Sequence, residues 1–240
     1  MGIARYFLAE DCSVRKMGCH WIILSAKHDR YLCVAHDELV TIGPRLQGWR
    51  DSDPKASKPV CSRENIGSAE NRLIESLVSN QIITSNPARG KPFAEFEYPV
   101  PETQIEDFGD IAASNRSFLR MARFLTACAK AHWYLKTQSL AHTLAGIESR
   151  RRMAASKDAA HAQALVSAFK SLRPLYPRPY VCLFDSLALL EFLAGYRYFP
   201  RLVFGVVADP FEAHCWLQNG TTLLNDHLER VAKYKPILSV

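Results

Sequence analysis

A proline-rich segment divides this sequence into two blocks and limits what the chain can fold into. Four prolines fall between residues 85 and 110: Pro87, Pro92, Pro99 and Pro101. Proline lacks a backbone donor and breaks helices, so no helix can run through this stretch. We therefore predict an extended linker over 85–112, with one domain over 1–84 and a second over 113–240. A length of 240 residues suits two domains.

The first block has strand patterns followed by helix patterns. Runs of aromatic and β-branched residues predict three strands, over 6–8, 21–24 and 31–34. The last two runs flank a polar turn and therefore predict a hairpin. Helices are predicted after His36 or Asp37, either of which can cap the first, and over 69–78. The block should form a small three-stranded domain with helices.

The second block begins with helix patterns and ends with strand patterns. Apolar residues at helical spacing predict helices over 118–128, 140–147 and 162–172. The stretch from Cys182 to Gly195 is apolar nearly all round, which indicates a buried helix. A strand is predicted over 201–207, and Asn219-Gly220 predicts a hairpin between two further strands. This order predicts an α+β domain.

Charge and hydropathy exclude several classes of function. The net charge is +6, and one basic cluster, Arg150 to Arg152, ends a predicted helix, where cations are favoured. No aromatic residues interleave this cluster, so no nucleic-acid partner is expected. No apolar run approaches the roughly 20 residues of a membrane span, and the N-terminus is not a secretory signal. We expect a cytoplasmic protein without a membrane partner.

Cys182 occupies the first turn of the predicted buried helix. The positive end of the helix dipole and the free backbone N–H groups there lower a thiol pKa and can hold an oxyanion. The chain has seven cysteines, and free buried thiols are the ordinary state of cysteine in a reducing compartment. Cys182 is thus either a nucleophile or one more core thiol.

His214 and Asp226 follow Cys182 at spacings that suit a catalytic triad. His214 lies 32 positions after Cys182 in a predicted strand, and Asp226 lies 12 positions further in the next strand. A thiol activated by histidine, with the histidine oriented by a carboxylate, is the general triad arrangement. Taken singly, His214 could be a core residue and Asp226 a helix cap. Their order along the chain favours the triad.

The region from Arg178 to the C-terminus resembles the lasso-peptide B proteins, which have a transglutaminase-like, papain-type fold. The family's cysteine, the histidine of its His-x-Trp motif and its later aspartate fall on Cys182, His214 and Asp226. Further matching segments are Phe204-Gly205-Val206, Pro210-Phe211, Trp216 and Tyr234-x-Pro236-Ile237. Many relatives have alanine and an acid where this chain has Cys215 and Gln218. Because side chains alternate along a strand, Cys215 should face away from His214 and be a poor nucleophile.

The first block resembles the PqqD-like domains that recognise the leaders of ribosomally made, modified peptides. Such a domain adds the leader as a strand to a sheet edge beside a helix. The resemblance implies a set of leader-binding residues on the candidate edge and helix: Tyr31, Leu32, Cys33, Val34, Leu73 and Leu77.

Together the resemblances imply a leader peptidase that frees the core amine of a lasso-peptide precursor for a partner cyclase. The cyclase of such pathways is asparagine-synthetase-like and closes a macrolactam. The family is linked to ATP, but Gly43-x4-Gly48 is followed by Trp49-Arg50 rather than the Lys-Ser/Thr of a phosphate loop. No cofactor is therefore expected in this chain.

Three other functions remain open. The same triad serves transglutaminases and arylamine acetyltransferases, which transfer an acyl group to an amine. A non-catalytic adaptor would deliver the leader without cleaving it. A zinc site would use four potential ligands: Cys12, Cys19, Cys33 and His36. The gap between Cys12 and Cys19 is wide for paired ligands.

Strand parity makes a structural prediction about the triad. A simple Asn219-Gly220 turn would pair His214 with Asn225 and turn Asp226 to the other face of the sheet. A longer loop or a bulge between Gln218 and Asp226 would move Asp226 onto the face of His214. We predict such an irregularity, with the Asp226 carboxylate in hydrogen-bond reach of His214; otherwise Asn225 is the candidate orienter.

Overall fold

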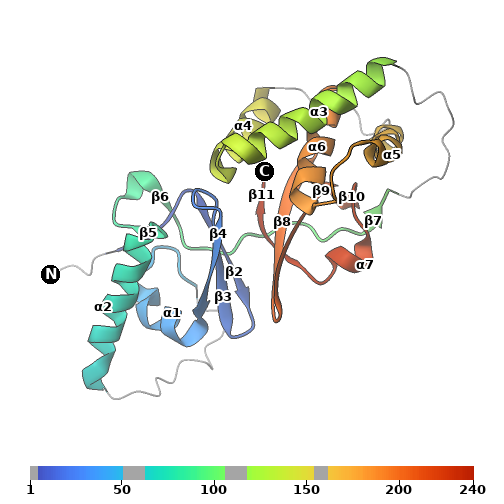
Figure 1. Ribbon diagram of the computed structural model, residues 1–240. Helices are drawn as coiled ribbons and strands as arrows, with labels where there is room; N and C mark the ends of the chain where they lie inside the picture. Colours follow the sequence, from blue (N-terminus) through green and yellow to red (C-terminus); the bar gives the residue numbers. More distant parts are fainter. Residues whose placement is uncertain (1–4, 51–62, 106–117, 154–161) are drawn as a thin grey trace. The chain divides into compact units, whose positions relative to one another are not determined.

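The chain folds into two compact units. The computed structural model describes residues 5–50, 63–105, 118–153 and 162–240 (Figure 1). The units are Met1–Glu97 and Tyr98–Val240. The division between them falls inside the segment predicted as a linker, of which 106–112 lies outside the described residues. Cys61 also lies outside them.

Unit 1 contains a three-stranded antiparallel sheet in the order β2-β3-β4. Its strands are β2 (Cys12–Met17), β3 (His20–Ser25) and β4 (Arg30–Ala35). The predicted hairpin corresponds to β3 and β4, with Trp21 opposite Val34 and Leu24 opposite Tyr31. Strand β2 was not predicted. Its buried Cys12 and Val14 are followed by Arg15 and Lys16, which obscure the strand pattern.

A second small sheet in unit 1 contains the predicted first strand. It has the order β5-β1-β6, with β1 (Phe7–Ala9), β5 (Ile83–Thr84) and β6 (Gly90–Lys91). The helices of the unit are α1 (His36–Ile42) and α2 (Arg63–Ser79), with short 3-10 turns at Gly43–Arg45 and Pro87–Arg89. The N-cap of α1 is Ala35, so the prediction of a cap at His36 or Asp37 is wrong. The His36 ring instead accepts a hydrogen bond from Trp21 Nε1 at 2.9 Å.

Residues just beyond Thr84 complete the core of unit 1. Phe93 is 1% exposed, and its ring packs against Trp21 and Trp49, with centroids 5.7 and 5.6 Å away. Strand β6 pairs with β1 in the same stretch. Residues 85–97 therefore belong to the fold of this unit.

Fragments of unit 1 should differ sharply in stability. We expect 1–97 to unfold cooperatively on heating and 1–84 to show no cooperative transition. Loss of a buried phenylalanine alone costs about 3–5 kcal/mol, and a domain this small has a narrow margin of stability. Circular dichroism melts of the two fragments provide the measurement. Superimposable melts would show that 85–97 contributes nothing to the fold.

Unit 2 places one buried helix between other helices and a sheet. Its helices before the sheet are α3 (Phe118–Thr137), α4 (Leu140–Met153), α5 (Ala162–Leu172) and α6 (Cys182–Ala194), with a 3-10 turn at Arg173–Leu175. Helix α6 packs against α3 and α5 and against strand β9 (Figure 1). Nine of its residues are buried, which confirms the predicted buried helix.

The sheet of unit 2 has five strands in the order β11-β8-β9-β10-β7. They are β7 (Thr103–Gln104), β8 (Arg201–Ala208), β9 (Phe211–Asn219), β10 (Thr222–Leu223) and β11 (Lys235–Ser239), with α7 (Leu228–Val231) before the last. All neighbours are antiparallel except β10 and β7. The predicted mixture of helices and antiparallel strands is confirmed. Strands β7 and β11 were not predicted.

The buried amide of Gln218 connects β9 to the start of unit 2. Gln218 is 0% exposed. Its Nε2 donates to the carbonyls of Pro99 (2.8 Å) and Gly220 (2.7 Å), and its Oε1 accepts from Trp216 Nε1 (2.9 Å). Both amide hydrogens and the amide oxygen thus have partners inside the protein.

None of the helices in the described ranges combines the length and the apolar character that a membrane span needs.

The three arginines near the end of α4 form ion pairs: Arg150 with Glu191, and Arg151 and Arg152 with Glu148.

Candidate active site

Cys182 is the first residue of α6, as its sequence position predicts. Val181 is the N-cap, and the first helical hydrogen bond runs from Asp185 N to Val181 O at 2.9 Å. The N–H groups of the first turn have no acceptor within a helix and point toward its N-terminal end. Cys182 is partly buried, and as the first residue of α6 it lies at the helix end where these N–H groups are free.

His214 and Asp226 are brought together beside this helix end. His214 Nε2 is hydrogen-bonded to Asp226 Oδ2, and the two side chains are 11% and 6% exposed. The other carboxylate oxygen accepts the backbone N–H of His227 at 2.8 Å. His214 also forms a hydrogen bond with the Cys182 side chain. Because Asp226 occupies Nε2, Nδ1 is the ring nitrogen available for this bond.

The connection between β9 and Asp226 differs in part from the prediction. Asn219 pairs with Thr222 and Gln218 with Leu223, so the loop has two residues, shifted by one from the predicted turn. The predicted longer loop is wrong. Asp226 nevertheless reaches His214, as predicted, because regular pairing stops after β10 and the chain bends.

Asn225 causes this departure from regular pairing. Its side-chain Oδ1 accepts the Leu217 N–H at 2.7 Å, in place of a backbone carbonyl, and its Nδ2 donates to Ser186 Oγ at 2.9 Å. Both ends of the amide are therefore engaged away from His214. Asn225 lies at the bend, and Asp226 is the residue whose carboxylate is hydrogen-bonded to His214.

Cys215 lies against Cys182, contrary to the expectation that strand alternation would remove it from the site. Both its side chain and its backbone form hydrogen bonds with Cys182. Helix α6 packs against β9 here, and the Cys215 carbonyl accepts a hydrogen bond from Ser186 Oγ of α6 at 3.4 Å. Sequence alternation alone gives no signal for the contact of Cys215 with Cys182.

The site favours a thiolate beside an imidazolium. Hydrogen bonds from the Cys215 side chain and from His214 lower the pKa of Cys182 from 9.0 to about 4 despite burial. Burial disfavours the charge on His214, but Asp226 and Cys182 outweigh it and raise its pKa to about 9. Burial likewise opposes ionisation of Asp226, yet the bond to His214 and the His227 N–H lower its pKa. All three groups are thus charged at neutral pH.

Aromatic rings hold the imidazole in place. The His214 ring lies 5.1 Å from that of Tyr234 and 6.1 Å from that of Trp216. Gly205 is opposite His214 on β8. A Cβ at Gly205 would lie 2.7 Å from the Trp216 ring and 2.9 Å from Tyr234 Cβ, so this packing requires glycine there.

Cys182 should be the most reactive thiol of the chain, and its reactivity should depend on pH in a defined way. Because its pKa is lowered to about 4, the thiolate persists above about pH 4 and is lost below it. Burial raises the pKa of Cys12 to about 11 and that of Cys128 to about 12. Iodoacetamide should therefore modify Cys182 at pH 6 well before these two thiols. Peptide mass mapping measures the rate at which each cysteine is modified. Slow modification of Cys182 would show that it is an ordinary buried thiol and not a nucleophile.

The candidate leader-binding residues lie on one strand and one helix of unit 1. Strand β4, with Tyr31 to Val34, is an edge strand of its sheet. Cys33 is exposed and Val34 is 7% exposed. On α2, Leu77 is buried in the core at 2%, whereas Leu73 only packs against it. Leu73 is therefore more available to a peptide than Leu77.

The proposed zinc ligands are not brought together. Within residues 5–50, 63–105, 118–153 and 162–240, no group of three or more histidine, cysteine, aspartate or glutamate side chains could hold a metal ion. Cys12 is buried, whereas Cys19 and Cys33 are exposed.

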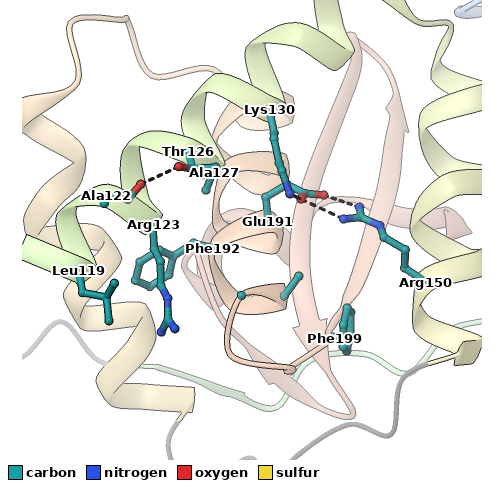
Figure 2. A pocket seen from close by; sticks show the side chains of 12 residues that line it. Leu119, Ala122, Arg123, Thr126, Ala127, Lys130, Arg150, Glu191, Phe192 and Phe199 are labelled. Atoms are coloured by element: carbon teal, nitrogen blue, oxygen red, sulfur yellow. Dashed lines mark hydrogen bonds and ion pairs between the residues drawn. The ribbon is translucent and has the colours of Figure 1, made fainter.

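A cavity of about 360 Å³ lies elsewhere in unit 2, between α3, α4 and the end of α6. Figure 2 shows Lys130 and Arg150 reaching the buried carboxylate of Glu191 from α3 and α4. Glu191 lies nine residues after Cys182, which is about 13 Å along a helix. The cavity is therefore separate from the cysteine site.

Comparison with known proteins assigns a superfamily to the region that contains Cys182, His214 and Asp226. Residues 124–239 match the model of the Transglutaminase-like superfamily. No curated protein and no solved structure matches the chain. The matched region runs from within α3 to β11 and contains Cys182 on α6, His214 on β9 and Asp226 after β10. Residues 124–239 thus form a domain of the transglutaminase-like superfamily, a type of domain with cysteine-protease or acyltransferase activity.

Proposed function

We propose that this protein is the leader peptidase of a lasso-peptide pathway, with Cys182, His214 and Asp226 as its catalytic residues. The observation that supports this most is the line of thiol, imidazole and carboxylate at the N-terminus of α6. A nucleophile, a base and a residue that orients the base are what amide hydrolysis by a cysteine enzyme requires.

The reaction follows from these positions. The Cys182 thiolate attacks the scissile carbonyl at the leader–core junction, and the first N–H groups of α6 stabilise the oxyanion. His214 then gives its proton to the leaving amine of the core peptide as the C–N bond breaks. The neutral imidazole next takes a proton from water, whose oxygen attacks the thioester. The leader carboxylic acid leaves, and Cys182 is restored. Asp226 holds the ring orientation throughout.

Unit 1 supplies the binding part of the proposal. An edge strand offers unpaired backbone groups to which an extended peptide can add as a further strand. Arg30 at the start of β4 donates to Asn80 Oδ1 just after α2, at 2.9 Å. Strand β4 and the end of α2 are therefore held together. The leader would lie along Tyr31 to Val34 with apolar side chains near Leu73.

The partners and the compartment follow from this function. The freed core amine would pass to an asparagine-synthetase-like cyclase, which would also account for any dependence on ATP. Free thiols are typical of the reducing cytosol, and the six cysteines in the described ranges are all free. We propose a cytosolic enzyme on these grounds.

Mass spectrometry of a precursor peptide tests the proposal. A candidate precursor peptide, sought among the short reading frames next to the gene, is incubated with the purified protein and the products are weighed. A peptidase yields two fragments whose masses sum to the peptide plus one water. An adduct on an added amine would identify an acyltransferase, for which the same triad suffices. Tight binding of an intact peptide would instead identify a non-catalytic adaptor.

A further inference from the structure

Arg173 is a buried arginine that holds the loop before Cys182. Its side chain is 3% exposed. It donates to the carbonyls of Tyr176 (3.2 Å), Arg178 (3.0 Å) and Pro179 (3.2 Å). A guanidinium can make these bonds together because its donors lie in one plane with fixed directions. The backbone that leads into α6 is thereby fixed from one point.

The same guanidinium also binds a carboxylate in the first turn of α6. Arg173 Nε is hydrogen-bonded to Asp185 Oδ1, and Asp185 Oδ2 accepts the N–H of Val181 at 2.7 Å. Asp185 follows Cys182 by three residues, so the two side chains are neighbours on the helix surface. A carboxylate beside a thiolate disfavours it, because like charges repel.

We propose that Arg173 is a positioning residue for Cys182, which neutralises Asp185 and fixes the loop that leads to the nucleophile. The proposal deepens the proposed function, on which it rests. Asp185 is useful as a partner for the Val181 N–H and at the positive end of α6. Without Arg173 its charge would act against the Cys182 thiolate. When Arg173 neutralises it, the Asp185 carboxylate can accept the Val181 N–H without destabilising the Cys182 thiolate.

Other groups also determine how Cys182 ionises, and the test must separate them from Arg173. His214 and Cys215 on β9 interact with Cys182 directly, and Asp226 after β10 acts on it through His214. Asp185 lies three residues along α6 from Cys182 and is bound by Arg173, and both of these charges also act on the buried Cys128 of α3. Substitution of Arg173 or Asp185 leaves the first three unchanged. The charges of Arg173 and Asp185 can therefore be removed while His214, Cys215 and Asp226 stay the same.

The test is the pH dependence of Cys182 alkylation by iodoacetamide in the full chain, which needs no peptide substrate. In Arg173→Gln the acid limb of the rate profile should move upward by about one pH unit, from the uncompensated carboxylate. Asp185→Asn should move it downward. The double variant should return it close to the wild-type position, and Arg173→Lys, which keeps the charge but loses the planar set of donors, should move it less than Arg173→Gln does.

A matched arginine serves as control. Arg152 is 77% exposed and pairs with Glu148 on α4, so Arg152→Gln should leave the profile unchanged. A folded Arg173→Gln variant whose acid limb superimposes on that of the wild type overturns the proposal. If circular dichroism shows that Arg173→Gln does not fold, Asp185→Asn decides, and an unchanged limb overturns the proposal. A wild-type Cys182 that reacts no faster than Cys12 would count against the proposed function itself.

Discussion

Cys182→Ala is expected to reduce cleavage of the precursor by about 10⁵–10⁶-fold, because loss of a nucleophile removes the whole acyl-transfer route. Leader affinity should stay nearly unchanged, because Cys182 lies in unit 2 and the proposed leader site lies in unit 1. Cleavage is measured by mass spectrometry and affinity by titration of the leader peptide.

The matched control for this variant is Cys19→Ala, since Cys19 is an exposed thiol of unit 1. It should cleave and bind like the wild type. Normal cleavage by Cys182→Ala would remove Cys182 from the mechanism. Loss of leader affinity in Cys182→Ala would show that binding and chemistry are not separate.

Asp226→Asn should reduce kcat by about 10³–10⁴-fold while changing KM little, as loss of the orienting carboxylate does in triad enzymes. The amide can donate to His214 Nε2 and so favours the tautomer that cannot accept the thiol proton. The pKa of His214, now about 9, should fall without its carboxylate partner. The alkaline limb of the rate profile should move to lower pH accordingly.

Glu229→Gln is the control for Asp226→Asn, because Glu229 is an exposed carboxylate three residues further along. It should leave kcat and the pH profile unchanged. If Asp226→Asn keeps full activity, then Asp226 does not orient the histidine, and its hydrogen bond to His214 is structural only.

The sequence predicts the parts of the fold whose pattern is local. The apolar run after Cys182 and the β-branched run at 201–207 correspond to α6 and β8. Strand β7 was missed because it has two residues in a proline-rich stretch and pairs only with distant β10. Strand pairing between segments far apart in sequence leaves no local period to detect.

The site shows the same division between local and nonlocal information. Cys182, His214 and Asp226 could be selected because residue type, order and helix position all suit one chemistry. The contact of Cys215 with Cys182 depends on how α6 packs against β9. The role of Arg173 depends on the path of the loop that it binds. Neither can be predicted from the spacing of residues in the sequence, because each depends on the path of the chain near the N-terminal end of α6.

The amide of Gln218 limits where the catalytic unit can be cut from the rest of the protein. A fragment that begins after residue 99 lacks the Pro99 carbonyl, to which Gln218 Nε2 donates. One amide hydrogen would then be left in the interior without an acceptor, at a cost of about 1–3 kcal/mol. An independently expressed catalytic fragment should therefore start at or before Tyr98, upstream of the helices that the family match covers.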